Sequence, residues 1–554
     1  MDETSTSLAR LAILHVDESN GSDEGDGSIR NPLKSALAAY TLNLDAQVLT
    51  RKAEENEYKE ISASGSKKTK KLAEVRVNKA KKQQEELRIQ QEAQQRKLDE
   101  AKAIEIHQDK SLPLARKIKI RDSIASRGQR IKIFGWLHSL RSQKGLIFID
   151  LRDGTGYIQC VLSGQLAQTY DALTLTLETT IAVYGVVAAL PEGKSAFDNH
   201  ELKADFFEVI GKAPGGEDAF LNVVAEDSKK LDYLLDQRHL VLRRETEASL
   251  FKVRAAVLKA FRQSYDELGL LEVTPPCMVQ TQVEGGGTLF EFNYYGKSAY
   301  LTQSSQLYLE TCLPSLGDVF CVQESFRAEK SMTRRHLSEY THVEAEIGFV
   351  VFEDLLVHIE EVICRTITTV LSDPYAGPMI AKLNPSFVPP TRPFMRLEYK
   401  DAITYLNEHH ILKEDGSEHE FGDDIAEAAE RAMTDQIGLP IFLTRFPVEI
   451  KSFYMKKCED DRRVTESVDV LMPGVGEITG GSMRIDEYEE LLEGYAREGI
   501  DPKPYYWYTD QRKYGTCSHG GYGLGLERFL AWLCDRFTVR DLSLYPRFTE
   551  RCRP

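Results

Sequence analysis

A long run without proline or glycine constrains the fold of this 554-residue chain more than any other feature. From Lys67 to Ile106 the sequence consists mainly of Lys, Gln, Glu, Ala and Arg, which are all good helix formers. The apolar side chains in the run are too sparse for a sustained heptad, so a long exposed helix is expected. Such a helix separates a small segment before it from the larger part of the chain that follows.

Charge is distributed unevenly around this helix. The whole chain has a net charge of −16, whereas residues 67–102 hold 12 Lys/Arg against 6 Asp/Glu. A basic arm on an acidic body binds a phosphate backbone, because the local potential governs the interaction. The arm therefore has two interpretations: a tether that assists RNA binding, and a solvated spacer helix.

Composition also restricts the compartment. No run of about 18 apolar residues is present, so we expect no membrane span and no membrane partner. The acidic start, Met1 to Ser7, has the pattern of neither a signal peptide nor a transit peptide. The nine cysteines contain no Cys-x-x-Cys pair, which argues against structural zinc and a disulfide framework. These features predict a cytoplasmic location.

Two changes of pattern divide the rest of the chain. Between residues 111 and 214, short β-branched segments alternate with turns, which predicts a small antiparallel barrel of the kind that binds oligonucleotides. From residue 247 onward, helical and strand patterns alternate, which predicts an α+β domain on a largely antiparallel sheet. The predicted parts are a small N-terminal module (1–60), a basic helical arm (61–110), the barrel (111–214), a hinge (215–246) and the α+β domain (247–554).

A charged hairpin in the α+β domain, Phe326 to Glu346, has the residues for a nucleotide site. Arg327 and Glu329 are two residues apart and are expected on one face of a strand. A polar loop follows, then Arg335 and His336 and a returning strand. Cations facing a cleft suit a triphosphate, and a carboxylate acceptor suits the amino group of adenine. The alternative is a solvated hairpin without a ligand.

A glycine-rich segment, Gly520 to Arg528, strengthens the nucleotide interpretation. It predicts a strand that leads into a helix, with Arg528 in the first turn, where the helix dipole also favours anions. The two Gly-Lys-Ser stretches are not P-loops, because Ala188 and Glu291 stand where the first glycine is required. The spacing of a Rossmann fingerprint is also missing. The nucleotide site is therefore of another type.

These elements, with the helix and strand that end at Pro275, resemble the three motifs of class II aminoacyl-tRNA synthetases. The resemblance covers residues 115–554 and points to the subgroup with an N-terminal OB-fold, which contains the aspartate, asparagine and lysine enzymes. Segments 303–310 and 473–484 resemble the eukaryotic cytoplasmic asparagine-specific members. The small N-terminal module and the basic arm resemble the N-terminal extension of those members. The resemblance implies a homodimer that joins L-asparagine to tRNA(Asn) through an adenylate, using ATP and Mg²⁺.

The resemblance also implies residue roles. Arg327 grips the α-phosphate and the amino-acid carboxylate, Glu329 accepts from adenine, and Glu477 ligates magnesium with help from Asp469. The attacking carboxylate is already ionised, so adenylyl transfer needs alignment and charge stabilisation and no general base. The implied catalytic residues are Arg327, Arg528 and Glu477. The implied ATP-binding set is Arg327, Ala328, Glu329, Arg335, His336, Leu337, Glu477, Gly525, Leu526, Glu527 and Arg528.

Specificity for the amino acid depends on a short upstream segment. Leu309 stands where the aspartate enzymes have a lysine, and Glu310 is expected to accept a hydrogen bond from an amide NH₂. Arg484 would donate to the amide oxygen, while aspartate would meet Glu310 with like charge. The alternatives are an exposed helical charge for Glu310 and an aspartate enzyme. The implied amino-acid set is Glu284, Gln306, Leu309, Glu310, Arg327, Gly480 and Arg484, with Glu284 receiving the α-ammonium.

The barrel carries candidates for anticodon binding. Phe148 and Gln159 lie on neighbouring predicted strands, and in the family the matching positions stack on and hydrogen-bond the middle anticodon base. Arg141 is expected to contact the same RNA strand. The alternative for Phe148 is burial in the barrel core. The loop 196–200 contains less glycine than this family's pattern predicts, which leaves its conformation open.

A catalytically inactive relative on the same scaffold is another alternative. Such a protein would be expected to lose the charges that grip phosphate, yet Arg327, Arg335, Arg528 and Glu477 are all present. A stand-alone asparagine-making ligase would lack the barrel. We therefore expect an active synthetase.

Overall fold

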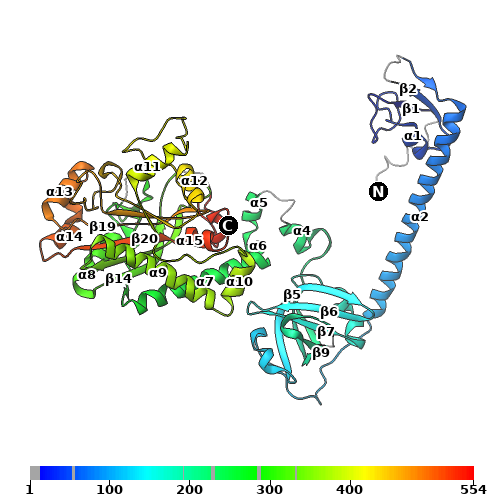
Figure 1. Ribbon diagram of the computed structural model, residues 1–554. Helices are drawn as coiled ribbons and strands as arrows, with labels where there is room; N and C mark the ends of the chain where they lie inside the picture. The colour runs from blue at the N-terminus through cyan, green and yellow to red at the C-terminus, as the bar shows by residue number, and fades with distance from the viewer. Residues whose placement is uncertain (1–12, 53–56, 191–192, 226–230, 284–287, 331–332) are drawn as a thin grey trace. The chain divides into compact units, whose positions relative to one another are not determined.

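The computed structural model describes residues 13–52, 57–190, 193–225, 231–283, 288–330 and 333–554. The chain forms two compact units, Met1–Asn222 and Val223–Pro554, which we describe separately (Figure 1). Among these described residues, no helix combines the length and apolar character needed to cross a membrane.

The first unit begins with a small α/β module. Strands β1 (Ile13–Asp17) and β2 (Gln47–Arg51) pair in parallel, and β3 (Lys59–Glu60) adds to β2 antiparallel. Helix α1 (Ala36–Leu42) begins where Ser35 accepts a hydrogen bond from the Ala38 amide. The buried Asp17 pairs with Arg51, and this ion pair lowers the pKa of Asp17 to about 2. The module thus has its own core and one paired internal charge.

The predicted long helix is α2 (Ala63–Ala101). It starts four residues earlier than predicted, because Ser62 caps it by accepting from the Gly65 amide, and it ends before Ile106. Within it only Ala73 and Ala101 are buried. Nearly all of its polar and basic side chains therefore face solvent, as composition predicts.

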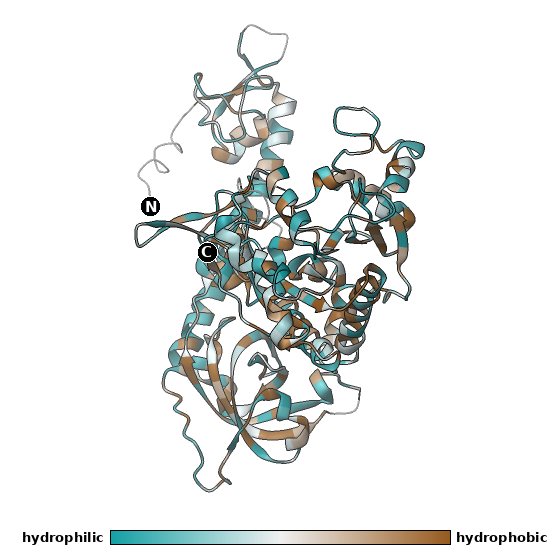
Figure 2. Ribbon diagram, turned by 90° about the vertical axis from the view of Figure 1, so that its left-hand side faces the viewer, coloured by the Kyte–Doolittle hydropathy of each residue, from teal (hydrophilic) through white to brown (hydrophobic). Residues whose placement is uncertain are grey.

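The barrel is a six-stranded sheet in the order β4-β5-β6-β7-β9-β8, and pairing of β8 with β5 closes it. Inward residues such as Ile149, Leu151 and Ile158 alternate with outward ones, which appears as alternating brown and teal along the strands in Figure 2. This arrangement confirms the predicted barrel. Its strands are β4 (Arg116–Lys117), β5 (Arg130–Gln143), β6 (Leu146–Arg152), β7 (Tyr157–Leu162), β8 (Thr180–Ala189) and β9 (His200–Gly211).

The second unit is built on an eight-stranded sheet in the order β10-β14-β15-β20-β19-β18-β17-β16. Its outer pairs, β10–β14 and β16–β17, are parallel, and the other neighbours are antiparallel. The predicted antiparallel α+β domain is confirmed. The strands are β10 (Leu271–Glu272), β14 (Val319–Phe326), β15 (Glu339–Gly348), β16 (Met395–Glu398), β17 (Ile441–Thr444), β18 (Ser467–Met472), β19 (Gly476–Met483) and β20 (His519–Gly525).

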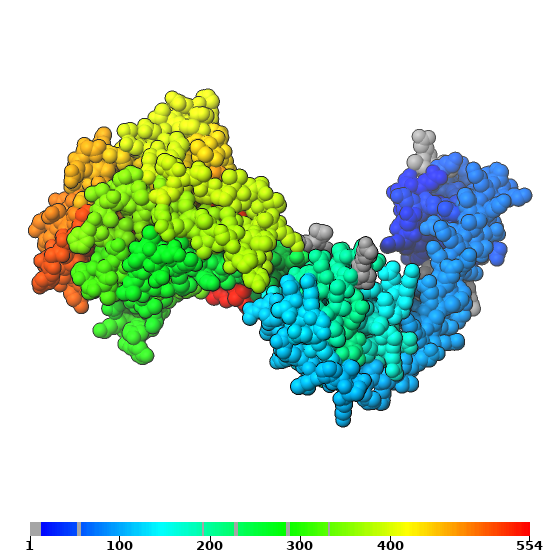
Figure 3. Space-filling model, turned by 60° about the horizontal axis from the view of Figure 1, so that its bottom comes forward, coloured from blue at the N-terminus to red at the C-terminus, as the bar shows by residue number. Residues whose placement is uncertain are grey.

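Helices cover one face of this sheet, and the middle of the opposite face carries polar residues. Val343, Ala345 and Ile347 of β15 pack in one core with α7 (Glu245–Glu267), α9 (Phe352–Ser372), α10 (Ala376–Leu383) and α15 (Leu526–Leu533). Figure 3 views the unit from the side of α7, α9 and α10. Since side chains alternate along a strand, the intervening polar residues of β15 project from the opposite face.

Smaller elements border that polar face. They are α8 (Gln306–Leu316), α11 (Tyr399–Glu408), α12 (Glu427–Ile437), α13 (Tyr488–Arg497), α14 (Tyr506–Thr509), and a three-stranded sheet of β11 (Met278–Val279), β13 (Lys297–Leu301) and β12 (Glu291–Tyr294). The segment before α7 contains α5 (Leu231–Asp236) and α6 (Arg238–Val241).

Candidate active site

A cavity of about 240 Å³ opens on the polar face of the large sheet. Its walls come from β15, β18, β19 and β20, from α8, and from the loop between β14 and β15. Most of the residues singled out from the sequence line it, although they are spread over more than two hundred positions. These are Gln306, Leu309, Arg327, Glu329, Arg335, His336, Leu337, Asp469, Glu477, Gly480, Arg484, Gly525, Glu527 and Arg528.

A few candidates lie elsewhere. Leu526 is fully buried in the main core, and Glu310 is buried behind the cavity wall. Ala328 follows Arg327 but is not part of the lining. Glu284 lies outside the described residues.

Carboxylate Glu477 is the centre of one end of the cavity. Its Oε2 lies 2.9 Å from Arg528 Nη1 and 3.7 Å from Arg335 Nη2. Burial raises the pKa of Glu477, but these two guanidinium groups outweigh it and lower the pKa to about 2. Arg528 lies in the first turn of α15, as predicted. This end therefore presents an ionised carboxylate between two cations.

A second carboxylate, Asp469, lies beside Glu477. A Cβ placed on Gly480 would be 3.4 Å from Asp469 Oδ1 and 3.5 Å from Glu477 Oε1, so both oxygens flank this glycine. Burial raises the pKa of Asp469 to about 6, against the effect of Lys451, whose Nζ is 2.9 Å away. Hard carboxylate oxygens facing one space suit a magnesium ion.

The hairpin differs from the prediction in one respect. Strand β14 ends at Phe326, so Arg327 and Glu329 do not share a strand face. They approach each other from an irregular segment, with Arg327 Nη1 4.0 Å from Glu329 Oε1, and His336 Nε2 lies 3.6 Å from Glu329 Oε2. The prediction of a strand was wrong because the sheet partner of β14, strand β15, begins only at Glu339.

The C-terminal segment holds this irregular loop in place. The Ser338 amide donates to the Arg547 carbonyl at 2.7 Å, and Thr549 Oγ1 donates to the Glu329 carbonyl at 3.1 Å. The Val539 amide donates to the Arg334 carbonyl at 3.1 Å. Residues 538–549 therefore contact both sides of the loop that carries Arg335 and His336. The sequence contained no signal for this role.

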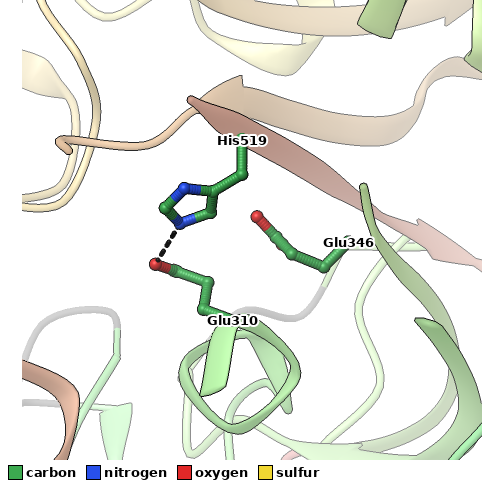
Figure 4. Close-up of side chains that lie close together, drawn as sticks. All are labelled: Glu310, Glu346 and His519. Atoms are coloured by element: carbon green, nitrogen blue, oxygen red, sulfur yellow. Dashed lines mark hydrogen bonds and ion pairs between the residues drawn. The ribbon is translucent and has the colours of Figure 1, made fainter. Parts of the chain in front are cut away.

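The other end of the cavity leads to a buried charge network around Glu310 (Figure 4). Glu310 is 3% exposed, so the interpretation as a surface charge is wrong. Four donors surround its carboxylate. Gln306 Nε2 and Tyr508 OH lie 3.1 and 3.0 Å from Oε1, and Arg512 Nη2 and His519 Nε2 lie 2.8 and 3.0 Å from Oε2. The expected open acceptor is thus already fully hydrogen-bonded, since a carboxylate accepts about four hydrogen bonds.

Arg484 is paired just as tightly. Its Nε and Nη2 each donate to the Glu346 carboxylate at 2.9 Å, and its Nε is 3.9 Å from Glu310 Oε1. Burial opposes protonation of His519, but hydrogen bonding to Cys517, whose carbonyl accepts from Nδ1 at 2.7 Å, and to Glu310 raises its pKa to about 10. Glu310, Glu346 and His519 could be mistaken for metal ligands, since their ligand atoms lie within 4.8 Å of one another. Two guanidinium groups and a protonated imidazole already balance these carboxylates, so the cluster does not suit a cation.

Four members of this network were missed by sequence reasoning. Glu346 is the last residue of the charged hairpin, and His519 directly precedes the glycine-rich segment. A polar residue at a strand position that is expected to be buried was a signal that sequence reasoning could have used for both. Tyr508 and Arg512 come from α14 and the turn after it, about two hundred residues from Glu310, and no motif marks them.

The barrel candidates share one face. Arg141 is paired across the sheet with Phe148, and Phe148 with Val161, two residues from Gln159. Arg141 Nη2 donates to Gln159 Oε1 at 3.0 Å, and Gln159 Nε2 donates to Glu201 Oε2 at 3.2 Å. Phe148 is half-buried and is not a member of the barrel core, which argues against the core alternative. The amide of Gln159 is held by two charged neighbours.

Family models match the chain in three places. The model for tRNA synthetases class II (D, K and N) matches residues 230–549. The model for the asparaginal-tRNA synthetase N-terminal domain matches residues 28–113, and that for an OB-fold nucleic acid binding domain matches residues 131–210. The matches cover the small module and α2, the barrel, and the unit with the cavity.

Relatives match along nearly the whole chain. The cytoplasmic asparagine–tRNA ligase of Saccharomyces cerevisiae is 61% identical over 98% of this chain and 100% of its own length. The human enzyme is 53% identical over the same shares. The structure of Entamoeba histolytica asparaginyl-tRNA synthetase in complex with asparaginyl-adenylate covers 80% of this chain and 100% of its own, with 43% identity and a TM-score of 0.75. The chain therefore belongs to the class II tRNA synthetases of the D, K and N group, in the family of the asparagine–tRNA ligases.

Proposed function

We propose that this protein activates L-asparagine with ATP and transfers it to tRNA(Asn) in the cytoplasm. The observation that carries the proposal is a single cavity with two chemically different ends. One end has the cations and carboxylates for a magnesium-bound triphosphate, and the other is backed by Glu310 and Arg484. Relatives over the full length are named cytoplasmic asparagine–tRNA ligases, which supports the substrate and the compartment.

In the first step, an oxygen of the asparagine α-carboxylate attacks the α-phosphorus of ATP, and the bond to pyrophosphate breaks. The carboxylate is ionised at neutral pH, so alignment and charge stabilisation are what the site must supply. Arg327, directly after β14, would hold the α-phosphate and the carboxylate together, and Arg335 and Arg528 would hold the outgoing phosphates. Glu477 and Asp469 would hold Mg²⁺, which neutralises phosphate charge when bound.

In the second step, a terminal ribose hydroxyl of tRNA attacks the carbonyl carbon of the adenylate, and AMP leaves. The barrel holds the anticodon, with Phe148 as a stacking surface and Gln159 and Arg141 as edge contacts. Helix α2 adds sequence-independent attraction to the RNA backbone. Replacing Lys79, Lys81 and Lys82 with glutamate should weaken tRNA binding and flatten its salt dependence; an unchanged salt slope would make α2 a spacer.

The choice of asparagine rests on Leu309, Glu310 and Arg484. Leu309 lines the cavity without a charge, so no lysine meets a substrate carboxylate there. Glu310 is held ionised, because Arg512 and His519 outweigh the effect of burial and lower its pKa. An ionised Glu310 favours an amide NH₂ over a carboxylate. Glu284 is proposed to receive the α-ammonium.

We further propose a homodimer formed through the edge of the large sheet at β10. Leu271 of β10 is half exposed, and its amide donates to the Asp318 carbonyl. A half-exposed apolar side chain on an open sheet edge is suited to covering by a second copy. Sedimentation of the full chain tests this: a monomer at micromolar concentration would contradict it.

The decisive experiment for the function is ATP–pyrophosphate exchange with asparagine and aspartate side by side. Exchange should depend on asparagine and barely respond to aspartate. Equal rates with the two amino acids would refute the assignment.

A further inference from the structure

The four donors around Glu310 are sorted by charge. Both charged donors, Arg512 and His519, bind Oε2, while both neutral donors, Gln306 and Tyr508, bind Oε1. Charge-assisted hydrogen bonds are about twice as strong as neutral ones. The donors at Oε2 are therefore held firmly, and a donor at Oε1 is easier for a ligand to replace. Of the two neutral donors, Gln306 lines the cavity, whereas Tyr508 is fully buried. A ligand in the cavity therefore replaces the Gln306 amide on Oε1 before it replaces the Tyr508 hydroxyl.

Arg512 is itself held rigidly. Its side chain is fully buried, and its Nε donates to the Ile485 carbonyl at 2.8 Å. Its Nη2 also reaches Tyr508 OH at 3.0 Å, and its guanidinium lies 4.3 Å from the centre of the Tyr508 ring. Ile485 directly follows Arg484 in the chain. One guanidinium group thus braces Glu310 on one side of the network and the backbone next to Arg484 on the other.

We propose that Arg512 is the positioning residue that sets asparagine specificity, by anchoring Oε2 of Glu310 so that only Oε1 is offered to the substrate. This inference rests on the proposed function, in which Glu310 recognises the substrate amide. The asparagine amide NH₂ takes the place of the Gln306 NH₂ on Oε1. Both groups are carboxamides, so the exchange preserves the number and type of hydrogen bonds. An aspartate carboxylate has no hydrogen to donate, and the exchange fails.

Charge balance makes Arg512 necessary for this arrangement. Glu310 and Glu346 are opposed by Arg484, Arg512 and His519, and Arg484 is committed to Glu346 through two hydrogen bonds. Without Arg512, protonated His519 would be the only cation among the described residues that is hydrogen-bonded to the buried Glu310 carboxylate. Removing one partner of such a buried pair leaves an uncompensated charge, which the site would relieve by protonating Glu310 or turning it away. Either response weakens the rejection of aspartate.

The test compares Arg512→Met and Arg512→Lys with the wild type in pyrophosphate exchange. Arg512→Met should raise the KM for asparagine by about a hundredfold and lower the ratio of asparagine to aspartate activation at least tenfold. The KM for ATP should change less than about threefold, because the hydrogen bonds of Arg512 within the described part of the chain go to Ile485, Tyr508 and Glu310 and to no side chain of the ATP end. Arg512→Lys, which keeps one charged donor, should restore part of the ratio. The matched control is Lys513→Met, since Lys513 is the next residue, half exposed and paired only with Asp510 among the described acidic side chains.

A pH series separates positioning from mere support of the fold. In Arg512→Met, activation of aspartate relative to asparagine should rise as the pH falls from 8 to 6, because Glu310 becomes easier to protonate. The wild type should show no such trend. If Arg512→Met does not fold, Arg512→Lys and Tyr508→Phe carry the test, and the KM for asparagine should rise in both while the KM for ATP is kept.

Two results would overturn the inference. One is an unchanged asparagine-to-aspartate ratio in the folded Arg512 variants, and the other is a parallel rise of the KM values for asparagine and ATP, which indicates general loosening. Failure of the proposed function looks different, because the wild type itself would then show no asparagine-dependent exchange.

Discussion

The two ends of the cavity are built on opposite principles. At the ATP end, the side chains of Arg327, His336 and Glu477 are 28–33% exposed. Their charged atoms lie 3.6–4.0 Å from those of Glu329 and Arg335, and only the pair of Glu477 with Arg528 among these is closer, at 2.9 Å. At the amino-acid end, the side chains of Glu310 and Arg512 are at most 1% exposed and are fully hydrogen-bonded. A triphosphate brings its own charge and metal, so loosely paired cations suffice. Choosing one amide among similar ligands requires groups that are fixed before binding.

The largest expected effect is confined to the ATP end of the cavity. Arg327→Ala should reduce adenylate formation by about a thousandfold or more, since it removes the charge that aligns the α-phosphate with the attacking carboxylate. Single-turnover adenylate formation measures the loss. Binding of tRNA should persist, because the barrel is a separate part of the chain. A folded variant that lost both activities would contradict the division of roles.

The next largest effect is confined to the amino-acid end of the cavity. Glu310→Gln should raise the KM for asparagine by about a hundredfold, since a neutral amide leaves Arg512 and His519 without their buried counter-charge. The KM for ATP should stay within about threefold of the wild type. Exchange kinetics with each substrate varied in turn provide the measurement. Similar changes in both KM values would mean that the two ends are not independent.

A third variant tests whether the barrel acts independently of both ends of the cavity. Gln159→Ala should lower the rate of tRNA charging by about tenfold, because one base-edge contact is lost and Arg141 and Glu201 lose their common partner. Pyrophosphate exchange should be unchanged. A normal charging rate would remove Gln159 from the anticodon site.

A smaller effect tests the C-terminal support of the ATP loop. Thr549→Val removes the hydrogen bond to the Glu329 carbonyl, which is worth about 1 kcal/mol. The KM for ATP should rise about fivefold, with the KM for asparagine unchanged. Thr538→Val is the matched variant, since Thr538 Oγ1 donates to the Arg334 carbonyl on the other side of the loop. No change in either variant would make the C-terminal segment irrelevant to ATP binding.

The smallest expected effect is a pH profile that stays flat at the amino-acid end. The pKa of His519 is raised to about 10, so between pH 6.5 and 9 it stays protonated in the folded protein. The KM for asparagine should therefore be constant over that range. The linked stabilisation is complete below the unfolded pKa of about 6.5 and is lost as the pH rises toward 10. Thermal unfolding should accordingly show the advantage of the wild type over His519→Gln shrinking between pH 7 and 10, and a constant difference would contradict the raised pKa.

Much of the fold and of the ATP end could be predicted from the sequence, because their signals are local. Alternation of residues in β6 and β7 reveals the barrel, and helix-forming composition reveals α2. Arg335 and His336 stand together in the chain, and Arg528 follows a glycine run that marks a strand entering a helix. The end of β14 at Phe326 was missed, since where a strand ends depends on where its partner begins.

The sequence by itself determined which charges are present, where most strands and helices lie, and that the ATP residues are those of a class II synthetase. Only the tertiary structure decided how those charges are paired. Glu310 reads as an open acceptor in the sequence, but the fold brings Tyr508 and Arg512 to it from about two hundred residues away and His519 from β20. A buried charge takes the partners that surround it in space, and sequence spacing does not reveal them. The side chains that discriminate asparagine are therefore visible in the sequence, while the side chain that holds them is visible only in the folded protein.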